Sequence, residues 1–371
     1  MSDEGASAGE GKTFGSVAQQ VRNRWSAVIS GEATVVLLTV VGVVLFPYLF
    51  VRAPVIGDVL NGTQSLAGLI LIWGIFALGF DLLLGRTGLL SFGHAALWGA
   101  GAYGAGWVIV NVTAAPLVAL VVGTVLAIVL SWLIGWLSLR RGGIYFAILT
   151  LAFGQMIYYT ALGPAAGITG GDNGLTGVDP GPLLGTFTLD SELPSMAGTL
   201  LGNWIYVLVA TVLVLSVVAV LRILNSPYGT VFRAIRENEQ RAEFVGLNTW
   251  RYKLMAFVLS GTFAGVAGAL FAIHSQYVPL SSLYWETSGE VVIMTVLGGV
   301  GTLFGPIFGA GLYLYVEIIV GNGHPFDWLV PYWHLVLGIV FVAVVVLLPE
   351  GIWGGVRTLR EWVGTRLRGE R

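Results

Sequence analysis

The chain has 371 residues, of which 56% are hydrophobic and only 10% are charged, and its formal net charge is −2. Soluble domains carry about a quarter charged residues because their surfaces face water, so this composition excludes an ordinary soluble domain. The absence of cysteine excludes disulfides, thiolate metal sites and cysteine nucleophiles, and the small net charge gives no indication that nucleic acid is a partner.

A polar segment precedes the first apolar run. Residues 1–12 are small and polar, as is typical of a disordered tail. Residues 14–29 carry apolar side chains at helical spacing together with two arginines, which predicts a helix lying on the membrane surface. The predicted domains are a cytoplasmic tail with an interfacial helix at 1–30, a transmembrane permease domain at 31–350, and a basic cytoplasmic tail at 351–371.

Long apolar runs fill most of the remaining chain, and several reach the roughly 20 residues that span a bilayer core of about 30 Å. The sequence therefore predicts an all-α fold, a polytopic transmembrane helix bundle of about ten spans with one re-entrant or broken segment. The predicted spans are 33–51, 64–84, 92–111, 116–139, 144–162, 203–223, 253–275, 288–300, 304–320 and 331–348. Span three follows a glycine-rich link and is the candidate for a re-entrant start. Span eight is short and ends in Gly298-Gly-Val-Gly301, a break that buried protein or a water-filled cavity must satisfy.

The predicted orientation follows from the basic residues, which stay on the cytoplasmic side of a membrane protein. In a ten-span chain with both termini in the cytoplasm, almost every arginine and lysine falls on that side, and Arg52 is the exception. The link 224–252 is then cytoplasmic. The link 163–202 is external, and it holds four acidic residues but no lysine or arginine.

Few residues in this chain are candidates for chemistry. Ser91 and His94 are three residues apart, but Leu89 breaks the G-x-S-x-G pattern of a serine hydrolase, so we interpret the pair as a helix start. Gly11-Lys12-Thr13 lacks the spacing of a phosphate-binding loop, so any ATP-driven function requires a separate ATPase subunit. No catalytic residue, metal site or cofactor is predicted.

Acidic residues inside membrane spans usually mark ion or proton paths. The spans contain few of them: Asp81, Glu290 and Glu317, none with an evident partner at the midplane of the membrane. Their scarcity disfavours a secondary transporter driven by protons or sodium.

Small residues at four-residue spacing mark close helix contacts. Gly261 and Gly265 form one such pair and Gly305 and Gly309 another. Packing within the chain is the favoured interpretation, and pairing with a partner permease is the alternative.

The cytoplasmic link contains a short amphipathic helix. Apolar residues follow one another at i, i+3, i+4 and i+7, namely Tyr228, Val231, Phe232 and Ile235, and Gly246 is the predicted stop. The functional interpretation is a helix that docks in a groove of another protein, an ATPase subunit. The alternative is a helix that folds back on this chain or on lipid headgroups.

Seven motifs in order resemble the branched-chain amino acid ABC permeases of the LivM type, from about span two to span ten. They begin at Gly88 (GLLSFGHAA, followed by GAGAY), Gly143 (GIYFAILTLAF), Thr169 (TGGDNGLTG), Ser226 (SPYG, followed by RAIRENE), Ser260 (SGTFAGVAG), Gly298 (GGVGTLFGP) and Pro349 (PEGI).

The resemblance implies a permease without its own ATPase site, in an importer for leucine, isoleucine and valine. The implied partners are a second permease of the LivH type, two ABC ATPase subunits and an extracytoplasmic substrate-binding protein, in a membrane lipid environment. Gln240-Arg241-Ala242, three residues and Gly246 are similar to a degenerate E-A-A-x3-G loop. The residues expected along the translocation path or at its external mouth are Ser91, His94, Gln155, Asp172 and Asn173.

Three alternatives remain open at this stage. Urea and short-amide permeases of the same family carry nearly the same motifs. A stand-alone channel or ion-coupled carrier is a second alternative, and a membrane-embedded enzyme using Ser91 and His94 is a third.

Overall fold

The structure is a computed structural model that describes residues 31–52, 62–140, 142–321, 332–355 and 358. Within these ranges the fold is helical, and the only extended pairing consists of isolated bridges such as Leu175 with Val278. The predicted interfacial helix at 14–29 and most of the basic tail at 351–371 lie outside the described residues.

Each of the ten predicted spans falls on a helix of the described chain. These helices are Gly31–Arg52, which ends in the π-helical turn η1 (Tyr48–Arg52), α3 (Gln64–Thr87), α4 (His94–Asn111), α5 (Pro116–Ser138), α6 (Ile144–Leu162), α9 (Trp204–Leu224), α12 (Thr249–Ser275), α13 (Trp285–Gly298), α14 (Gly305–Gly321) and α15 (Trp333–Leu347). Among the described residues, six helices are long and apolar enough to cross a membrane: Gly31–Arg52, α3, α5, α6, α9 and α12. The number of crossings stays a prediction.

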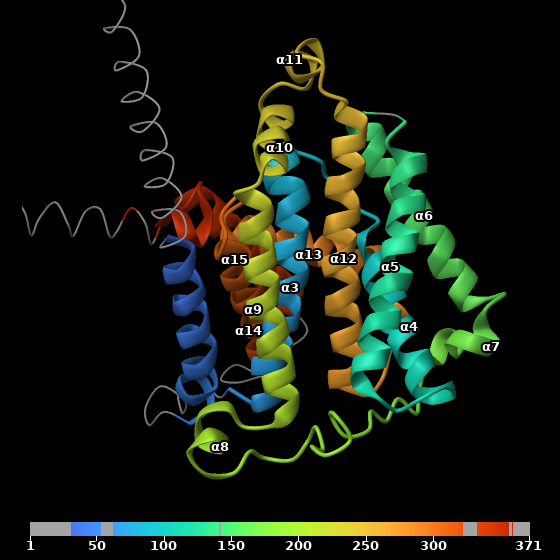
Figure 1. The fold of residues 1–371 in the computed structure, drawn as a ribbon, viewed down its shortest axis with the longest axis vertical. Helices are drawn as coiled ribbons and strands as arrows, with labels where there is room; N and C mark the ends of the chain where they lie inside the picture. The colour runs from blue at the N-terminus through green and yellow to red at the C-terminus, as the bar shows by residue number, and fades with distance from the viewer. Residues whose placement is uncertain (1–30, 53–61, 141, 322–331, 356–357, 359–371) are drawn as a thin grey trace, which may run out of the picture.

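Helix α3 lies at the centre of the bundle and is almost entirely buried. It begins at Thr63, whose hydroxyl accepts a hydrogen bond from the Leu66 backbone at 3.2 Å and so satisfies one free N–H of the first turn. It ends at Gly88, where the backbone turns left-handed with φ of 74°. Helices α9, α12, α13 and α14 pack around it (Figure 1).

Glycine lets these helices approach closely. A Cβ added at Gly261, Gly265, Gly305 or Gly309 would lie less than 3.0 Å from an atom of a neighbouring segment: Ser131, Ala127, Gly298 or Met294, respectively. Real Cβ atoms essentially never come this close, so larger residues have no room here. All four contacts are within the chain.

Helices α4 and α13 begin inside the bundle after segments that are not α-helical. Residues 88–93 lead into α4, and residues 276–284, which include η3 (Leu280–Leu283), lead into α13. The two helix starts meet, because the Ala95 backbone donates to the Ser288 hydroxyl at 2.8 Å. The helix start of span three therefore meets that of span eight, and the re-entrant start of span three stays a prediction.

The short helices outside the spans separate to the two ends of the molecule. Helices α10 (Pro227–Glu237) and α11 (Glu239–Phe244) lie at one end, and α7 (Ala166–Thr169) and α8 (Ser195–Leu201) lie toward the other (Figure 1). The 3-10 turn η2 (Gly171–Asn173) follows α7. This separation agrees with the charge asymmetry between the links 224–252 and 163–202.

Introduced cysteines test the predicted orientation, because the chain has no cysteine of its own. We expect Asp190→Cys to react with a membrane-impermeant thiol reagent applied outside intact cells. Arg251→Cys, exposed at the opposite end, should react only after permeabilisation. Mass-shift labelling of the purified protein measures both. Reversed accessibility of the two positions contradicts the ten-span topology.

Candidate functional site

The cytoplasmic link folds into two helices, α10 and α11, rather than one. Asn238 separates them in an extended conformation, with φ of −162° and ψ of 103°. Its side chain accepts from the Arg241 backbone at 2.8 Å, so it caps α11. The sequence prediction of a single amphipathic helix was wrong at this asparagine, since the cap restarts the helix in a new direction.

Helix α10 buries its apolar face against the chain itself. The Phe232 side chain is fully buried and Ile235 is 4% exposed, while Val231 is half-buried. The expectation that a partner covers Phe232 and Ile235 is therefore wrong, because α10 packs on α3, α9 and α12. Tyr228 is 48% exposed. It lies 6.2 Å, between ring centroids, from Tyr252 at the start of α12.

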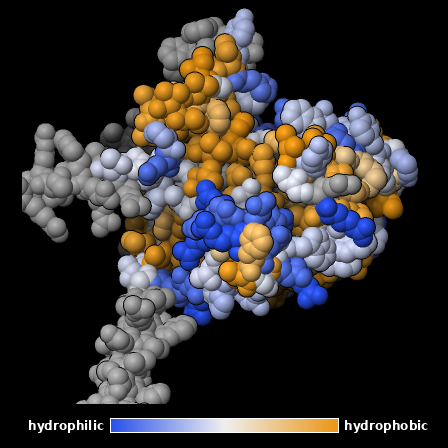
Figure 2. Space-filling model, turned by 90° about the horizontal axis from the view of Figure 1, so that it is seen from above, coloured by the Kyte–Doolittle hydropathy of each residue, from blue (hydrophilic) through white to orange (hydrophobic). Residues whose placement is uncertain are grey.

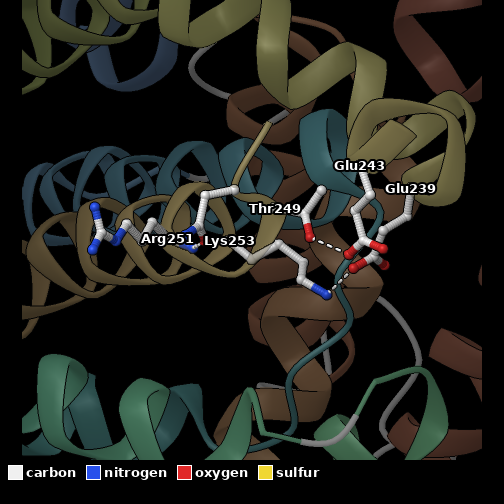
Figure 3. Close-up of polar contacts among 6 residues, drawn as sticks. Glu239, Glu243, Thr249, Arg251 and Lys253 are labelled. Carbon is white, nitrogen blue, oxygen red and sulfur yellow. Dashed lines mark hydrogen bonds and ion pairs between the residues drawn. The ribbon is translucent and has the colours of Figure 1, made fainter. Parts of the chain in front are cut away.

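Helix α11 is held on the first turn of α12 by two carboxylates (Figure 3). Glu239 forms an ion pair with Lys253, whose side chain is largely buried. The hydroxyl of Thr249 donates to Glu243 at 2.7 Å. Ala242 is buried beneath the same helix. These contacts fix the orientation of α11, and its opposite face is free of the chain.

The free face of α11 ends in two exposed apolar residues. Phe244 is 91% exposed and Val245 is 74% exposed, and both precede Gly246, whose φ is 87°. Figure 2 looks onto this end of the molecule and shows a hydrophilic central region that contains a small hydrophobic patch, with larger hydrophobic areas around it. We call Phe244 and Val245 the apolar tip. The sequence analysis missed the tip, although both residues lie between Ala242 and Gly246 of the degenerate E-A-A-x3-G loop.

Ser91 and His94 lie in the interior of the bundle. Both are fully buried. The Ser91 hydroxyl accepts from the Gly93 backbone at 3.3 Å, and His94 Nε2 lies 2.8 Å from the Ser260 hydroxyl. The His94 ring packs edge-on against Phe80 and Phe257. The two side chains therefore pack inside the bundle, but Ser91 does not cap α4, which begins after Gly93 without a side-chain cap, and no described group bonds to His94 Nδ1.

The other expected path residues lie on or beside α6. Gln155 is half-buried on this helix, and no side chain or backbone group of the described residues accepts from its amide Nε2. Asp172 and Asn173 are exposed on η2, which contacts α6. Tyr277 donates to the Asn173 carbonyl at 2.8 Å. The structure thus groups these three residues around α6, and Gly93, which lies between Ser91 and His94, packs against the same helix at Thr150 and Gly154.

Helix α6 differs from the other outer spans. It has the lowest mean hydropathy of the six apolar spans, yet no more of it is buried than of α5. Its exposed side chains include Tyr145, Met156 and Tyr159. The Tyr158 ring packs at a tilt against the ring of Tyr284, just before α13, with 5.0 Å between the ring centroids. The exposed face of α6 therefore mixes tyrosines with apolar side chains such as Ile144 and Ile148.

A cavity of about 630 Å³ brings together carboxylates that the sequence places apart. Glu286 and Glu290 of α13 and Glu317 of α14 line it. Its other lining residues include Trp73, Trp98, Phe271 and His334, and no lysine or arginine is among them. Glu290 and Glu317 line the same cavity because the turn between α13 and α14 folds the two helices together. The described residues contain no cluster of three or more ligands suited to a metal ion.

Comparison with known proteins places the chain among membrane permeases. The family described as "Branched-chain amino acid transport system / permease component" matches residues 62–345. The high-affinity branched-chain amino acid transport system permease protein LivM of Escherichia coli K12 is 30% identical over 317 residues, which cover 79% of this chain and 70% of that protein. Its counterpart in Salmonella typhimurium is 29% identical over 321 residues, with the same coverage.

A relative that matches a shorter part of the chain is named for the import of a different compound. The autoinducer 2 import system permease protein LsrC of Yersinia pseudotuberculosis is 30% identical over 101 residues, which cover 26% of this chain and 29% of that protein. No solved structure matches the chain.

Proposed function

The chain belongs to the family of branched-chain amino acid transport system permease components, and on this premise we propose that it is the membrane-spanning subunit of an ATP-binding-cassette importer for leucine, isoleucine and valine. It is a multi-pass membrane protein. The proposed complex contains a second permease, two ATPase subunits and an extracytoplasmic binding protein that delivers the solute. Residues 31–350 form the permease domain in this proposal, with the coupling link at 224–252 and the external link at 163–202.

The observation that carries the proposal is the apolar tip of α11. Phe244 and Val245 are exposed beside arginines and glutamates, at the end of the molecule predicted to be cytoplasmic. Large apolar side chains in such a place favour burial against a partner, since each is worth roughly 1.5–3 kcal/mol when fully covered. The tip fits a groove on an ATPase subunit, and the contacts of Glu239 and Glu243 hold it in place.

The proposed path lies along α6. The exposed face of α6 carries Tyr145 and Tyr159, and Gln155 is half-buried beside them. The helix ends near η2, at the end of the molecule predicted to be external. A path between this face and the second permease would offer hydroxyl and amide groups to a zwitterion without holding it tightly. In this proposal the two docked ATPase subunits close on each other when they bind ATP, and this movement displaces α11. The membrane helices then tilt, so that the path opens alternately to the two sides of the membrane.

The acidic cavity favours one competing function, an ion-coupled carrier. Glu286, Glu290 and Glu317 are the kind of intramembrane group that binds protons or cations in such carriers. The importer remains the stronger proposal, because the family match covers the bundle and the apolar tip has no role in a stand-alone carrier.

Uptake by reconstituted protein separates the two functions. We expect labelled leucine to enter proteoliposomes only when the ATPase subunits, the binding protein and ATP are all present. Uptake that persists without ATP and collapses with an ionophore supports the carrier instead. Competition by unlabelled valine, but not by urea or acetamide, supports the branched-chain substrate over the urea and short-amide alternative.

A further inference from the structure

A chain of contacts joins α10 to the turn between α13 and α14. Arg236 lies in the last turn of α10, and its guanidinium donates to the Gly85 carbonyl near the end of α3. Asp81 lies about one turn earlier on α3 and is 3% exposed. Its carboxylate accepts from the Gly301 backbone at 2.6 Å. Arg236 and Asp81 therefore connect three segments that are far apart in the sequence.

These segments meet without a gap. A Cβ added at Gly85 would lie 2.6 Å from the Gly301 backbone nitrogen, and one added at Gly301 would lie 3.2 Å from Arg236 Nη1. The φ of Gly301 is 83°, a conformation that other residues rarely adopt. Because nothing separates α3 from the turn, a shift of α10 and the end of α3 also shifts Gly301.

The turn is one end of α13, and the other end lies inside the bundle. From Gly298 the helix runs back to Trp285, passing Glu290 in the acidic cavity and Ser288, which accepts from the start of α4. The segment before α13 contacts α6 through η3. Movement of the turn is therefore carried along α13 toward the proposed path.

Packing alone does not require a carboxylate at the buried position of Asp81. A buried carboxylate is costly unless it is paired and hydrogen-bonded, and an apolar side chain of similar size often serves stability equally well. Asp81 has its hydrogen bond from the turn, and the positive charges of Arg86 and Arg236 act on it. The hydrogen bonds of Arg236 to Gly85 and of Gly301 to Asp81 hold α10, α3 and the turn against one another.

We propose that Arg236 and Asp81 are positioning residues that transmit the movement of α10 and α11 to the α13–α14 turn. They convert ATP hydrolysis by a docked subunit into opening of the path. This inference rests on the proposed function, and it separates two steps in it: docking belongs to the apolar tip, and transmission belongs to this pair.

Arg236→Ala in the complete, reconstituted transporter tests the transmission step. Arg233→Ala is the matched control, because Arg233 is an exposed arginine on the same helix that donates only within it, to the Gly229 carbonyl. We expect Arg236→Ala to retain the ATPase subunits and to hydrolyse ATP, while leucine uptake per ATP hydrolysed falls at least tenfold. Arg233→Ala should keep the wild-type ratio.

Conservative and double variants keep the test decisive if Arg236→Ala assembles poorly. Arg236→Lys keeps a charged donor and should restore most of the uptake per ATP. Asp81→Asn keeps an oxygen acceptor but loses the charge, so it should lower the ratio in the same direction. If the two residues act as one link, the double variant Arg236→Ala/Asp81→Asn should lower the leucine uptake per ATP no further than Arg236→Ala does alone.

Three outcomes overturn the inference. Wild-type uptake per ATP in Arg236→Ala shows that the contact transmits nothing. Loss of the ATPase subunits from Arg236→Ala, but not from Arg233→Ala, assigns Arg236 to docking instead. If the double variant lowers uptake per ATP by the product of the two single effects, the two residues have separate roles. If the wild-type chain itself retains no ATPase subunit, the proposed function fails, and the inference fails with it.

Discussion

Phe244→Asp should release the ATPase subunits from the membrane complex and stop uptake, while the permease itself stays folded in the membrane. The Phe244 side chain is 91% exposed in the chain, so folding does not depend on covering it. In the docked complex the same position is expected to be buried in a groove. An unpaired charge buried there costs about 3 kcal/mol or more, which corresponds to roughly 100-fold weaker association.

Co-purification of the ATPase subunits with the tagged permease measures the effect, with uptake assayed in parallel. Phe244→Leu is the matched control, because it keeps an apolar side chain at the tip and should retain the subunits. Ile235→Asp cannot replace this test, because Ile235 is buried within the chain and a charge there destabilises the permease itself. Full retention of the ATPase subunits by Phe244→Asp contradicts docking through the apolar tip.

Gly265→Leu should prevent the bundle from assembling. Gly265 of α12 faces α5, where an added Cβ would already lie less than 3.0 Å from the Ala127 Cβ. On its other side, the Gly265 backbone lies against Gly101 of α4. A leucine must push apart helices that small residues bring together, and overpacking of this kind costs at least about 1–3 kcal/mol.

The yield of monodisperse protein in detergent and its thermal unfolding measure this prediction. Gly42→Leu is the matched control, because Gly42 is also a helical glycine and a Cβ there meets nothing within 4 Å. We expect Gly42→Leu to behave as wild type. A Gly265→Leu variant with wild-type yield and unfolding temperature shows that α4, α5 and α12 can separate at no cost.

The sequence predicted the helices of the bundle well, because the length of an apolar run limits where a membrane helix begins and ends. The predicted span 144–162 coincides with α6, and most other bounds differ by a few residues. Patterns confined to one helix face, such as Gly261 with Gly265, also identified close contacts correctly.

The candidate site was harder to predict, because its features depend on which side of a helix meets which neighbour. The helical spacing of Phe232 and Ile235 identified an apolar face but could not show that α3, α9 and α12 cover it. The exposed pair Phe244 and Val245 has no periodicity to reveal it. Glu290 and Glu317 come together only because the turn at 299–304 reverses the chain.

The contact between the starts of α4 and α13 also determines when the bundle can be completed during synthesis. The hydrogen bond from Ala95 to Ser288 joins residues 193 positions apart. At a synthesis rate of about 5–20 residues per second, the ribosome needs roughly 10–40 s to supply the second partner after the first. During that interval the segment 88–93 and the first turn of α4 lack the α12 and α13 groups that later cover them. Backbone groups without partners do not persist in lipid, so the N-terminal half must wait in the insertion machinery or in a temporary arrangement. The bundle is therefore completed from its C-terminal half, after α12 and α13 have been delivered.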